Sequence, residues 1–347
     1  MILMSKRILA AACAAATALA LSACSPSAST GGKTSKDGTL TVMASFYPLK
    51  YLAEKVGGEH VTVTSLTPDG AEPHDLELSP KMVDSLASAD AVVYLAGFQG
   101  AVDEAVEQHA PKTVIDVSPA AQLVAIDSTS NHPGEDEDTD EAQSGEAQSG
   151  EAADHDHEGH EHEGHDHEHA DHDHHHDMSM DPHFWLDPAR MANAATLVGD
   201  KLAEADPTNA ETYKANAQAL NEELTSLGDN LVAKTSTCQI KTFVTAHTAF
   251  GYLADRTGLT QVGISGLDPE SSPSPARLAE IGKIVKDQGV TTIFTEALID
   301  PKVEQTLATD LGISTAVLDP IESQTDSSKD YAAVMNDNID ALTKANN

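Results

Sequence analysis

Two sets of short β-branched runs, each alternating with helical patterns, most constrain the fold of this chain. The first set, between Thr39 and Ser118, reads "TLTVMASF", "VTVTSLTP", "AVVYLA" and "TVIDVS". The second, between Lys241 and Pro320, reads "KTFVTAH", "TQVGISG", "VTTIFTE" and "ISTAVLDP". Strands that alternate with helices are typical of parallel sheets, because parallel neighbours need a helical crossover. We therefore expect an α/β fold of two similar parallel-sheet βα lobes.

A long helical pattern at residues 206–235 separates the two sets. Its apolar residues recur at spacings of three and four, which places them on one face of a helix. They are Tyr213, Ala217, Leu220, Leu224, Leu227 and Leu231. Asp206 suits the N-cap and Pro207 the first turn. Such a helix would be about 40 Å long and could join both lobes as a rigid connection. The predicted division is an N-terminal lobe at 39–205, the linking helix at 206–235 and a C-terminal lobe at 236–347.

The first residues have the pattern of an export signal. Lys6 and Arg7 precede an apolar run that ends at Leu21, too short and too early for an ordinary membrane span. The run closes in "LSAC", which resembles the bacterial lipobox, in which the cysteine receives a diacylglycerol. We expect a lipoprotein signal peptide at 1–23, lipidation of Cys24, and a Ser/Gly/Thr-rich flexible tether at 24–38. The alternative is a plain signal peptide with an incidental cysteine. The predicted location is extracytoplasmic, on the outer face of the cell membrane.

Cysteine use excludes an intramolecular disulfide in the mature chain. The sequence has three cysteines. Once Cys13 is removed with the signal and Cys24 is acylated, Cys238 alone remains. A buried, unreactive thiol is the expected state of this residue.

The charge distribution is strongly acidic. The net charge is −36, and half of it lies in residues 131–177, which hold 18 Asp and Glu and no Lys or Arg. An acidic surface repels nucleic-acid phosphates and attracts cations. Nucleic acid is therefore excluded as a partner.

A histidine-rich segment lies inside the predicted N-terminal lobe. Eleven histidines alternate with acidic residues and glycine: His155, His157, His160, His162, His165, His167, His169, His172, His174, His175 and His176. The segment has almost no large apolar residue, so we expect an insertion at 131–180 that is disordered without metal. Its histidines are predicted to form secondary, weak metal sites. The alternative is a solvated acidic spacer.

Four other side chains are candidates for a site held by the fold. In open α/β sheets, ligands bind beyond the carboxyl ends of the strands. His74, His247 and Glu296 each follow a predicted strand, and His183 stands in "DPHFWLDP" before a predicted helix. Three imidazoles and one carboxylate would form a closed four-coordinate shell that Zn²⁺ accepts. Taken singly, each could instead be a loop histidine, a helix cap or a paired carboxylate.

The order of the motifs resembles a known family. "GAEPHDLELSP", the His-rich insertion, "DPHFWLDP", "FVTAHTAFGYLADRTGL", "ISGLDPESSPSPARLAEI" and "IFTEALIDPKVEQTLA" follow one another as in zinc-binding lipoproteins of the metal-receptor family of ABC importers. The resemblance implies two lobes joined by a long rigid helix, with the metal in the interlobe cleft. It implies that His74, His183 and His247 are ligands. Glu296 matches the fourth position, which is a carboxylate in some members and left to water or another residue in others.

The resemblance also implies the function. We expect an extracytoplasmic, monomeric receptor that captures Zn²⁺ and delivers it to a permease with a separate ATPase, since the chain has no P-loop. Three histidines favour zinc over manganese, because members with two histidines and two carboxylates tend toward manganese. The alternatives are a manganese receptor of the same family and a surface metal buffer or adhesin. A metallo-hydrolase is a further alternative, but "HExxH" or an equivalent motif is missing, so we expect no enzymatic activity.

Overall fold

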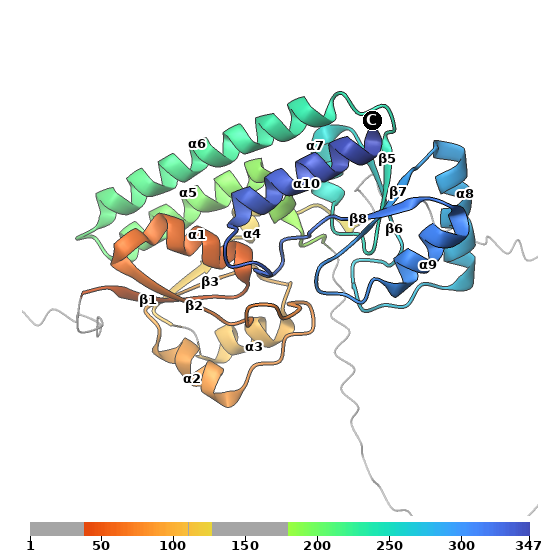
Figure 1. Ribbon diagram of the computed structural model, residues 1–347. Coiled ribbons are helices and arrows are strands. Elements are labelled where there is room, and N and C mark those ends of the chain that lie inside the picture. Colours follow the sequence, from red (N-terminus) through yellow and green to blue (C-terminus); the bar gives the residue numbers. More distant parts are fainter. Residues whose placement is uncertain (1–37, 110, 127–179) are drawn as a thin grey trace, which may run out of the picture. The chain divides into compact units, whose positions relative to one another are not determined.

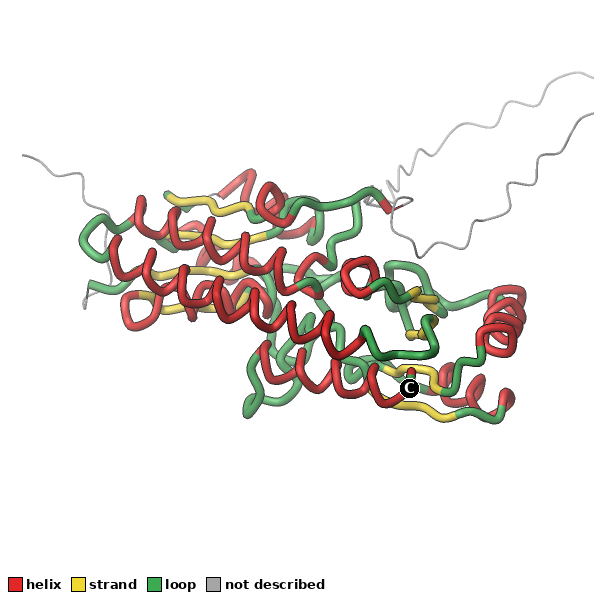
Figure 2. Tube along the Cα trace, turned by 90° about the horizontal axis from the view of Figure 1, so that it is seen from above, coloured by secondary structure: helices red, strands yellow, loops and turns green. Residues whose placement is uncertain are grey.

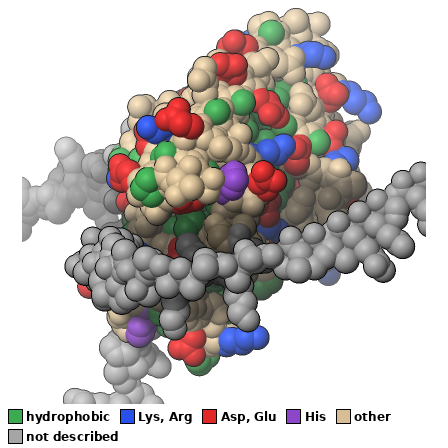
Figure 3. All heavy atoms as spheres, turned by 90° about the vertical axis from the view of Figure 1, so that its left-hand side faces the viewer, with side chains coloured by type: hydrophobic (Ala, Val, Ile, Leu, Met, Phe, Trp, Pro, Cys, Tyr) green, Lys and Arg blue, Asp and Glu red, His purple; other side chains and the backbone are tan. Residues whose placement is uncertain are grey.

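The computed structural model describes residues 38–109, 111–126 and 180–347. The predicted signal peptide and residues 24–37 of the tether, including Cys24, lie outside these residues, as do the eleven histidines from His155 to His176. Within the described part of the chain, none of the helices combines the length and the apolar character needed to cross a membrane. Where described residues are visible in Figure 3, Lys and Arg side chains are interspersed with Asp and Glu and form no continuous basic patch.

Two parallel sheets with the same strand order form the framework. The first has the order β2-β1-β3-β4 and the second β6-β5-β7-β8. The strands are β1 (Leu40–Ala44), β2 (Val61–Ser65), β3 (Ala91–Tyr94), β4 (Thr113–Asp116), β5 (Thr242–Thr245), β6 (Thr260–Gly263), β7 (Thr292–Thr295) and β8 (Ser314–Val317). Every pairing within the two sheets is parallel (Figure 1). The prediction of two parallel-sheet lobes is confirmed.

Helices connect and flank the strands. They are α1 (Tyr47–Gly57), α2 (Pro80–Ser88), α3 (Gly100–His109), α4 (Ser118–Ala121), α5 (Pro188–Ala205), α6 (Ala210–Thr235), α7 (Gly251–Thr257), α8 (Pro275–Gln288), α9 (Lys302–Leu311) and α10 (Tyr331–Asn346), with 3₁₀ turns at Gly58–His60 and Phe184–Leu186. Ser79, Ser274 and Asp330 cap α2, α8 and α10 by accepting a backbone N–H three residues later.

The long helix α6 begins at Ala210, four residues after the predicted start at residue 206. Asp206 is not its N-cap, because α5 continues to Ala205 and the Asp206 N–H bonds to the carbonyl of Leu202. The Asp206 carboxylate instead accepts hydrogen bonds from Asn209 and from the hydroxyl of Tyr213. The apolar face predicted for α6 is buried. The helix packs along α5, and the two form an antiparallel helical hairpin (Figures 1 and 2).

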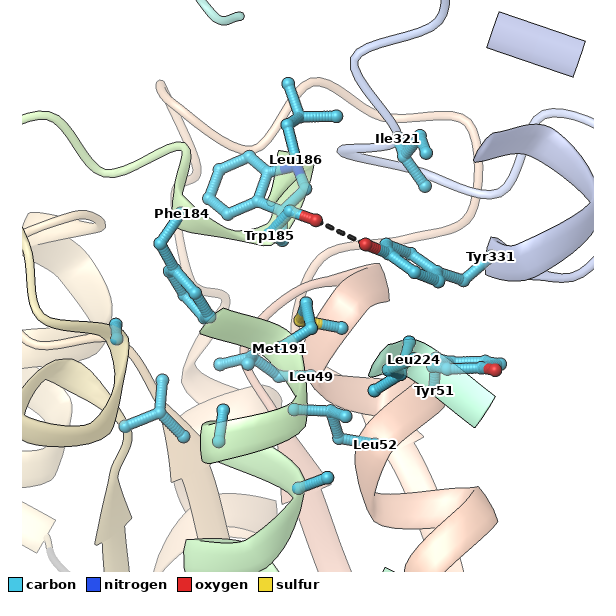
Figure 4. Packing of buried hydrophobic residues seen from close by; sticks show 14 of the residues in the cluster. Leu49, Tyr51, Leu52, Phe184, Trp185, Leu186, Met191, Leu224, Ile321 and Tyr331 are labelled. Atoms are coloured by element: carbon cyan, nitrogen blue, oxygen red, sulfur yellow. Dashed lines mark hydrogen bonds between the residues drawn. The ribbon is translucent and has the colours of Figure 1, made fainter. Parts of the chain in front are cut away.

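Residues 184–186 fix the junction between the two sheets. Phe184, Trp185 and Leu186 are fully buried. The Trp185 indole N–H donates to the carbonyl of Pro320, 2.8 Å away, and the Tyr331 hydroxyl donates to the Trp185 carbonyl. Figure 4 shows this packing among Leu49, Tyr51, Leu52, Phe184, Trp185, Leu186, Met191, Leu224, Ile321 and Tyr331. Because Trp185 bonds to the loop after β8, the segment that carries His183 has a fixed position.

The one cysteine in the described residues, Cys238, is buried and unpaired. Burial raises the pKa of its thiol. This confirms the prediction of a buried thiol.

The α5–α6 contact depends on a glycine. A Cβ on Gly199 would lie 2.5 Å from Cβ of Ala217 and 3.3 Å from the carbonyl oxygen of Tyr213. Alanine normally stabilises a helix interior by about 1 kcal/mol relative to glycine, but overpacking costs about 1–3 kcal/mol. The net effect of the two terms is a loss, so we expect Gly199→Ala to lower the free energy of unfolding by up to about 2 kcal/mol, measured by urea denaturation of the metal-free protein.

The matched control is Gly282→Ala in α8, where the new Cβ meets only Leu311 Cδ2 at an ordinary 3.5 Å. Here the helix preference is unopposed, so we expect a gain of about 0.5–1 kcal/mol. An equal gain at both positions would contradict close helix packing at Gly199.

Candidate metal centre

His247 follows β5 at the carboxyl edge of the second sheet. Its carbonyl accepts hydrogen bonds from Thr245 Oγ1 at 2.7 Å and from Gln261 Nε2 at 3.0 Å. Its backbone N–H and its ring Nδ1 both face Oε1 of Glu296, at 3.1 and 2.7 Å. With Nδ1 donating to this carboxylate, Nε2 is the ring nitrogen that points to the centre of the cluster, and it lies 3.3 Å from Oε1 of Glu322.

His183 is held in a similar way. Oδ1 of Asp181 accepts from the backbone N–H of His183 at 3.0 Å and lies 2.8 Å from its Nδ1. The His183 ring is fully buried, and its Nε2 lies 3.4 Å from Oε1 of Glu322. Two imidazoles therefore present Nε2 to the same carboxylate oxygen.

His74 comes from the loop after β2. Both carboxylate oxygens of Glu72 accept from its backbone N–H, at 3.0 and 2.9 Å. Its ring meets Phe98 edge to face, with the ring centroids 4.8 Å apart. Its Nε2 lies 3.4 Å from Oε1 of Glu322, so the third imidazole joins the other two.

Glu322 is the residue that the sequence interpretation missed. It lies in the loop after β8 and is 3% exposed. Ile321 before it has φ 57°, a left-handed conformation that is rare for a β-branched residue. The loop is held by Oδ1 of Asp319, which accepts from the Ile321 N–H at 2.8 Å, and by Ser323 Oγ, which accepts from the Gly70 N–H at 2.7 Å. These bonds direct the Glu322 carboxylate toward the histidines.

The spacing of these four side chains suits a tetrahedral ion. One ligand atom each from His74, His183, His247 and Glu322 lie within 4.8 Å of one another. Zinc–nitrogen and zinc–oxygen bonds of 2.0–2.1 Å in a tetrahedron place neighbouring ligand atoms about 3.3–3.4 Å apart. The three Nε2 atoms lie 3.4, 3.4 and 3.3 Å from Oε1 of Glu322. Three edges of the cluster therefore already have this length.

Glu296 does not join the cluster, although we expected it as the fourth ligand. Its Oε1 faces Nδ1 of His247, on the opposite side of the ring from Nε2. A carboxylate on the second nitrogen of a metal-binding histidine fixes the ring orientation and the tautomer. Both Glu296 and Glu322 follow parallel strands at the same sheet edge. The sequence pattern therefore predicts the edge of the sheet at which the site lies, but it does not show which of the two carboxylates reaches the centre of the cluster.

A small pocket adjoins the cluster. Its lining residues include Glu72 from the first lobe and Glu296, Asp319 and Glu322 from the second. The cluster thus lies between the two lobes, beside an acidic opening that attracts cations.

The carboxylates and imidazoles at the centre shift one another's pKa values. Burial raises the pKa of Glu322, but the three histidines outweigh it and hold that pKa well below its ordinary value. Burial lowers the pKa of His247, but the carboxylates of Glu296 and Glu322 outweigh it and raise that pKa to about 10. Burial also lowers the pKa of His183, and Asp181 and Glu322 reverse this to a net rise. In this part of the described structure, Nε2 of His183 and Nε2 of His247 are buried without a hydrogen bond of normal geometry. A cation would satisfy both atoms.

Comparison with known proteins decides the family. Residues 42–345 match the family described as "Zinc-uptake complex component A periplasmic", ZnuA. The chain belongs to the ZnuA family. This is a family of zinc-uptake components rather than of enzymes, and its description places it outside the cytoplasm.

Curated relatives of this ZnuA-family chain carry zinc names. It is 33% identical over 311 residues to the zinc-binding protein AdcA of Streptococcus pyogenes serotype M3, covering 88% of this chain and 56% of AdcA. The chain therefore spans just over half the length of that relative. It is 31% identical over 333 residues to the high-affinity zinc uptake system protein ZnuA of Bacillus subtilis, covering 94% of each chain.

Solved structures agree with this fold. The AdcAII protein of Streptococcus pneumoniae has a TM-score of 0.70 at 29% identity, covering 88% of this chain and 98% of that one. The laminin-binding adhesin of Streptococcus agalactiae has a TM-score of 0.70 at 27% identity, covering 89% and 100%. A Zn(II)-bound AdcAII variant of S. pneumoniae also matches, with a TM-score of 0.69 at 29% identity, covering 90% of this chain and 100% of that one.

The raised pKa of His247 predicts that a metal ion displaces a proton at neutral pH. A proton bound with a pKa of about 10 competes with the ion throughout the range from pH 7 to 8.5. We expect the apparent zinc association constant to rise about tenfold per pH unit over this range for each displaced proton, whereas an ordinary histidine near 6.5 would have levelled off. Isothermal titration in buffers of different ionisation enthalpy measures the proton release directly.

The matched variant is Glu296→Gln, which removes the largest charge that raises the pKa of His247. Its pH dependence above pH 7 is expected to be flatter than that of the wild type. A wild-type zinc affinity that does not change between pH 7 and 8.5 would contradict a protonated His247 in the metal-free protein.

Proposed function

We propose that this chain captures Zn²⁺ outside the cytoplasm and delivers it to an ABC permease whose ATPase is a separate chain. The observation that carries the proposal is the buried cluster of three imidazoles and Glu322 at tetrahedral spacing between the lobes. The zinc names of AdcA and ZnuA and the Zn(II)-bound AdcAII structure support zinc as the ion. Zinc is the substrate that the protein carries rather than a resident cofactor.

We assign His74, His183, His247 and Glu322 as the ligands of this ion, with Glu322 in the place expected for Glu296. Three nitrogens and one oxygen suit Zn²⁺, whereas Mn²⁺ favours a larger share of oxygen ligands. Four protein ligands close the shell and leave no position for a reactive water, which argues against a metallo-hydrolase. Glu296 and Asp181 then orient His247 and His183.

The remaining assignments follow from the sequence. We propose that Cys24 is the lipid anchor and that residues 24–38 tether a monomeric receptor to the membrane. The name "zinc-binding lipoprotein AdcA" of a S. pneumoniae relative supports the anchor. We propose that the receptor comprises two lobes, at 39–205 and 236–347, joined by the long helix α6 (Ala210–Thr235).

A role in adhesion is a second candidate function. The support is the match to the laminin-binding adhesin of S. agalactiae, one structure of which is described as a bifunctional protein with adhesin and metal transporting activity. A surface-anchored receptor of the same fold could serve both roles. Binding of the mature protein to immobilised laminin, with and without zinc, tests this candidate.

The described residues on either side of the histidine-rich segment lie next to each other. Ala125 and Met180 form an antiparallel bridge, and the Asp181 N–H donates to the Val124 carbonyl at 2.9 Å. The chain therefore leaves and re-enters the fold at one point. We therefore expect a shortened connection between these residues to leave the cluster intact.

We expect deletion of residues 135–177 to reduce the number of zinc ions bound while one tight site remains. The physical reason is that the four proposed ligands and their partners all lie outside the deleted residues. Equilibrium dialysis with metal quantification gives the stoichiometry, and competition with a chelator gives the affinity. His74→Ala in the deletion background is expected to abolish the remaining tight site. Loss of the tight site on deletion alone would make the histidine-rich segment the primary site.

The ligand assignment is tested by two isosteric substitutions, Glu322→Gln and Glu296→Gln, at carboxylates that are both buried. Loss of a partner outside the ligand shell typically costs 10- to 100-fold in metal affinity, so we expect Glu296→Gln within this range and Glu322→Gln beyond about 100-fold. Chelator competition measures both, and thermal unfolding of the metal-free variants confirms that each is folded. A larger loss for Glu296→Gln would restore Glu296 as the fourth ligand.

A further inference from the structure

We propose that Tyr252 is a positioning residue for zinc binding, acting on the ligand His183 through Asp181. The inference rests on the proposed function. Tyr252 lies on α7 of the second lobe, five residues after His247, and is 1% exposed. Its hydroxyl reaches the segment that carries His183.

The Tyr252 hydroxyl completes an interrupted backbone pair. In an antiparallel pair, two opposed residues exchange two backbone hydrogen bonds. The Asp181 N–H donates to the Val124 carbonyl at 2.9 Å, which is the first bond. In place of the second, the Val124 N–H donates to the Tyr252 hydroxyl at 3.0 Å, and that hydroxyl donates to the Asp181 carbonyl at 2.7 Å. The hydroxyl thus fixes the backbone of Asp181.

Asp181 passes this constraint to the ligand. The Asp181 side chain is 2% exposed, and its Oδ1 contacts both the backbone N–H and the ring Nδ1 of His183, at 3.0 and 2.8 Å. If the Asp181 backbone shifts, we therefore expect the His183 ring to rotate and its Nε2 to move away from the other three ligand atoms. Metal affinity depends on such outer partners because they fix the orientation of the ligand.

The position of Tyr252 is itself fixed. The guanidinium carbon of Arg190 lies 4.5 Å from the centre of the Tyr252 ring. Arg190 also donates to the carbonyl of Ala121 at 2.7 Å. Arg190 therefore ties α5 to the chain before Val124 while it stacks on the tyrosine.

The consequence is that α7 couples two ligands. His247 precedes this helix in the β5–α7 connection, and Tyr252 within the helix holds the pair from which His183 extends. The distance between the two imidazoles, whose ring centroids are 5.3 Å apart, then depends on one hydroxyl group. A tetrahedral ion is sensitive to this spacing, since all four ligand atoms must reach it together.

The test compares Tyr252→Phe with Tyr213→Phe in the full mature chain. Tyr213 is an equally buried tyrosine whose hydroxyl donates to Asp206, in the α5–α6 turn away from the cluster. We expect Tyr252→Phe to weaken zinc binding by about tenfold, the lower end for loss of an outer partner, and Tyr213→Phe to leave it unchanged. Trp185 is the only tryptophan, and its ring centroid lies 5.2 Å from that of His183, so its fluorescence reports on the site.

A double-mutant cycle separates positioning from general stability. If Tyr252 acts through Asp181, the zinc-affinity loss of Tyr252→Phe combined with Asp181→Asn is smaller than the product of the single losses. Multiplicative losses, or a lower melting temperature of metal-free Tyr252→Phe with unchanged zinc affinity, would overturn the inference. A wild-type chain without a tight zinc site would overturn the proposed function itself. If the wild type binds zinc tightly and Tyr252→Phe has the same zinc affinity, only the inference about Tyr252 is overturned.

Discussion

A buried carboxylate facing three imidazoles is the interaction on which this structure depends. Removing Glu322 from water is costly unless cations or hydrogen-bond donors compensate it, and three histidines from separate segments provide that compensation. The two sheets bring the loops of His74, His247 and Glu322 together, because parallel strands present their carboxyl ends at one edge. The segment that carries His183 does not follow a strand, and the buried Trp185 holds it against the Glu322 loop through the Pro320 carbonyl.

The three imidazoles are not held equally. Nδ1 of His183 and Nδ1 of His247 each face a carboxylate, at 2.8 and 2.7 Å. Nδ1 of His74 has no hydrogen-bond partner among the described residues, and its ring is held by packing on Phe98. Two of the proposed ligands, His183 and His247, are therefore oriented in the metal-free structure, whereas the third is constrained mainly through its backbone, by Glu72. His74 is the ligand that can adjust to the ion at least cost.

Much of this arrangement could be predicted from the sequence, and the exceptions have physical causes. Period and composition predict the eight strands and the apolar face of α6, because both follow from local geometry. The predicted start of α6 was wrong, because the N-cap preference of Asp206 does not reveal that the preceding helix α5 ends at this residue. Glu322 was missed because its direction depends on the left-handed Ile321 and on bonds from Gly70 and Trp185, distant in sequence. Glu296 does lie at the predicted edge of the sheet. The sequence does not reveal, however, that its carboxylate lies 2.7 Å from Nδ1 of His247 and so faces away from the centre of the cluster.

A closed shell between two lobes has a consequence for delivery. An ion held by His74 from one lobe and by His247 and Glu322 from the other cannot leave while all three remain in place. The α5–α6 hairpin joins the lobes through a continuous core and resists a wide hinge motion. Beside the ligands, by contrast, the Glu322 loop is tied to the first lobe by the Gly70–Ser323 bond and contains a strained Ile321. We expect that a local change in this loop would remove Glu322 from the cluster without unpacking the helices, because strained residues at functional sites are suited to such a change. The fold therefore combines a rigid framework with the proposed fourth ligand, Glu322, on a strained loop.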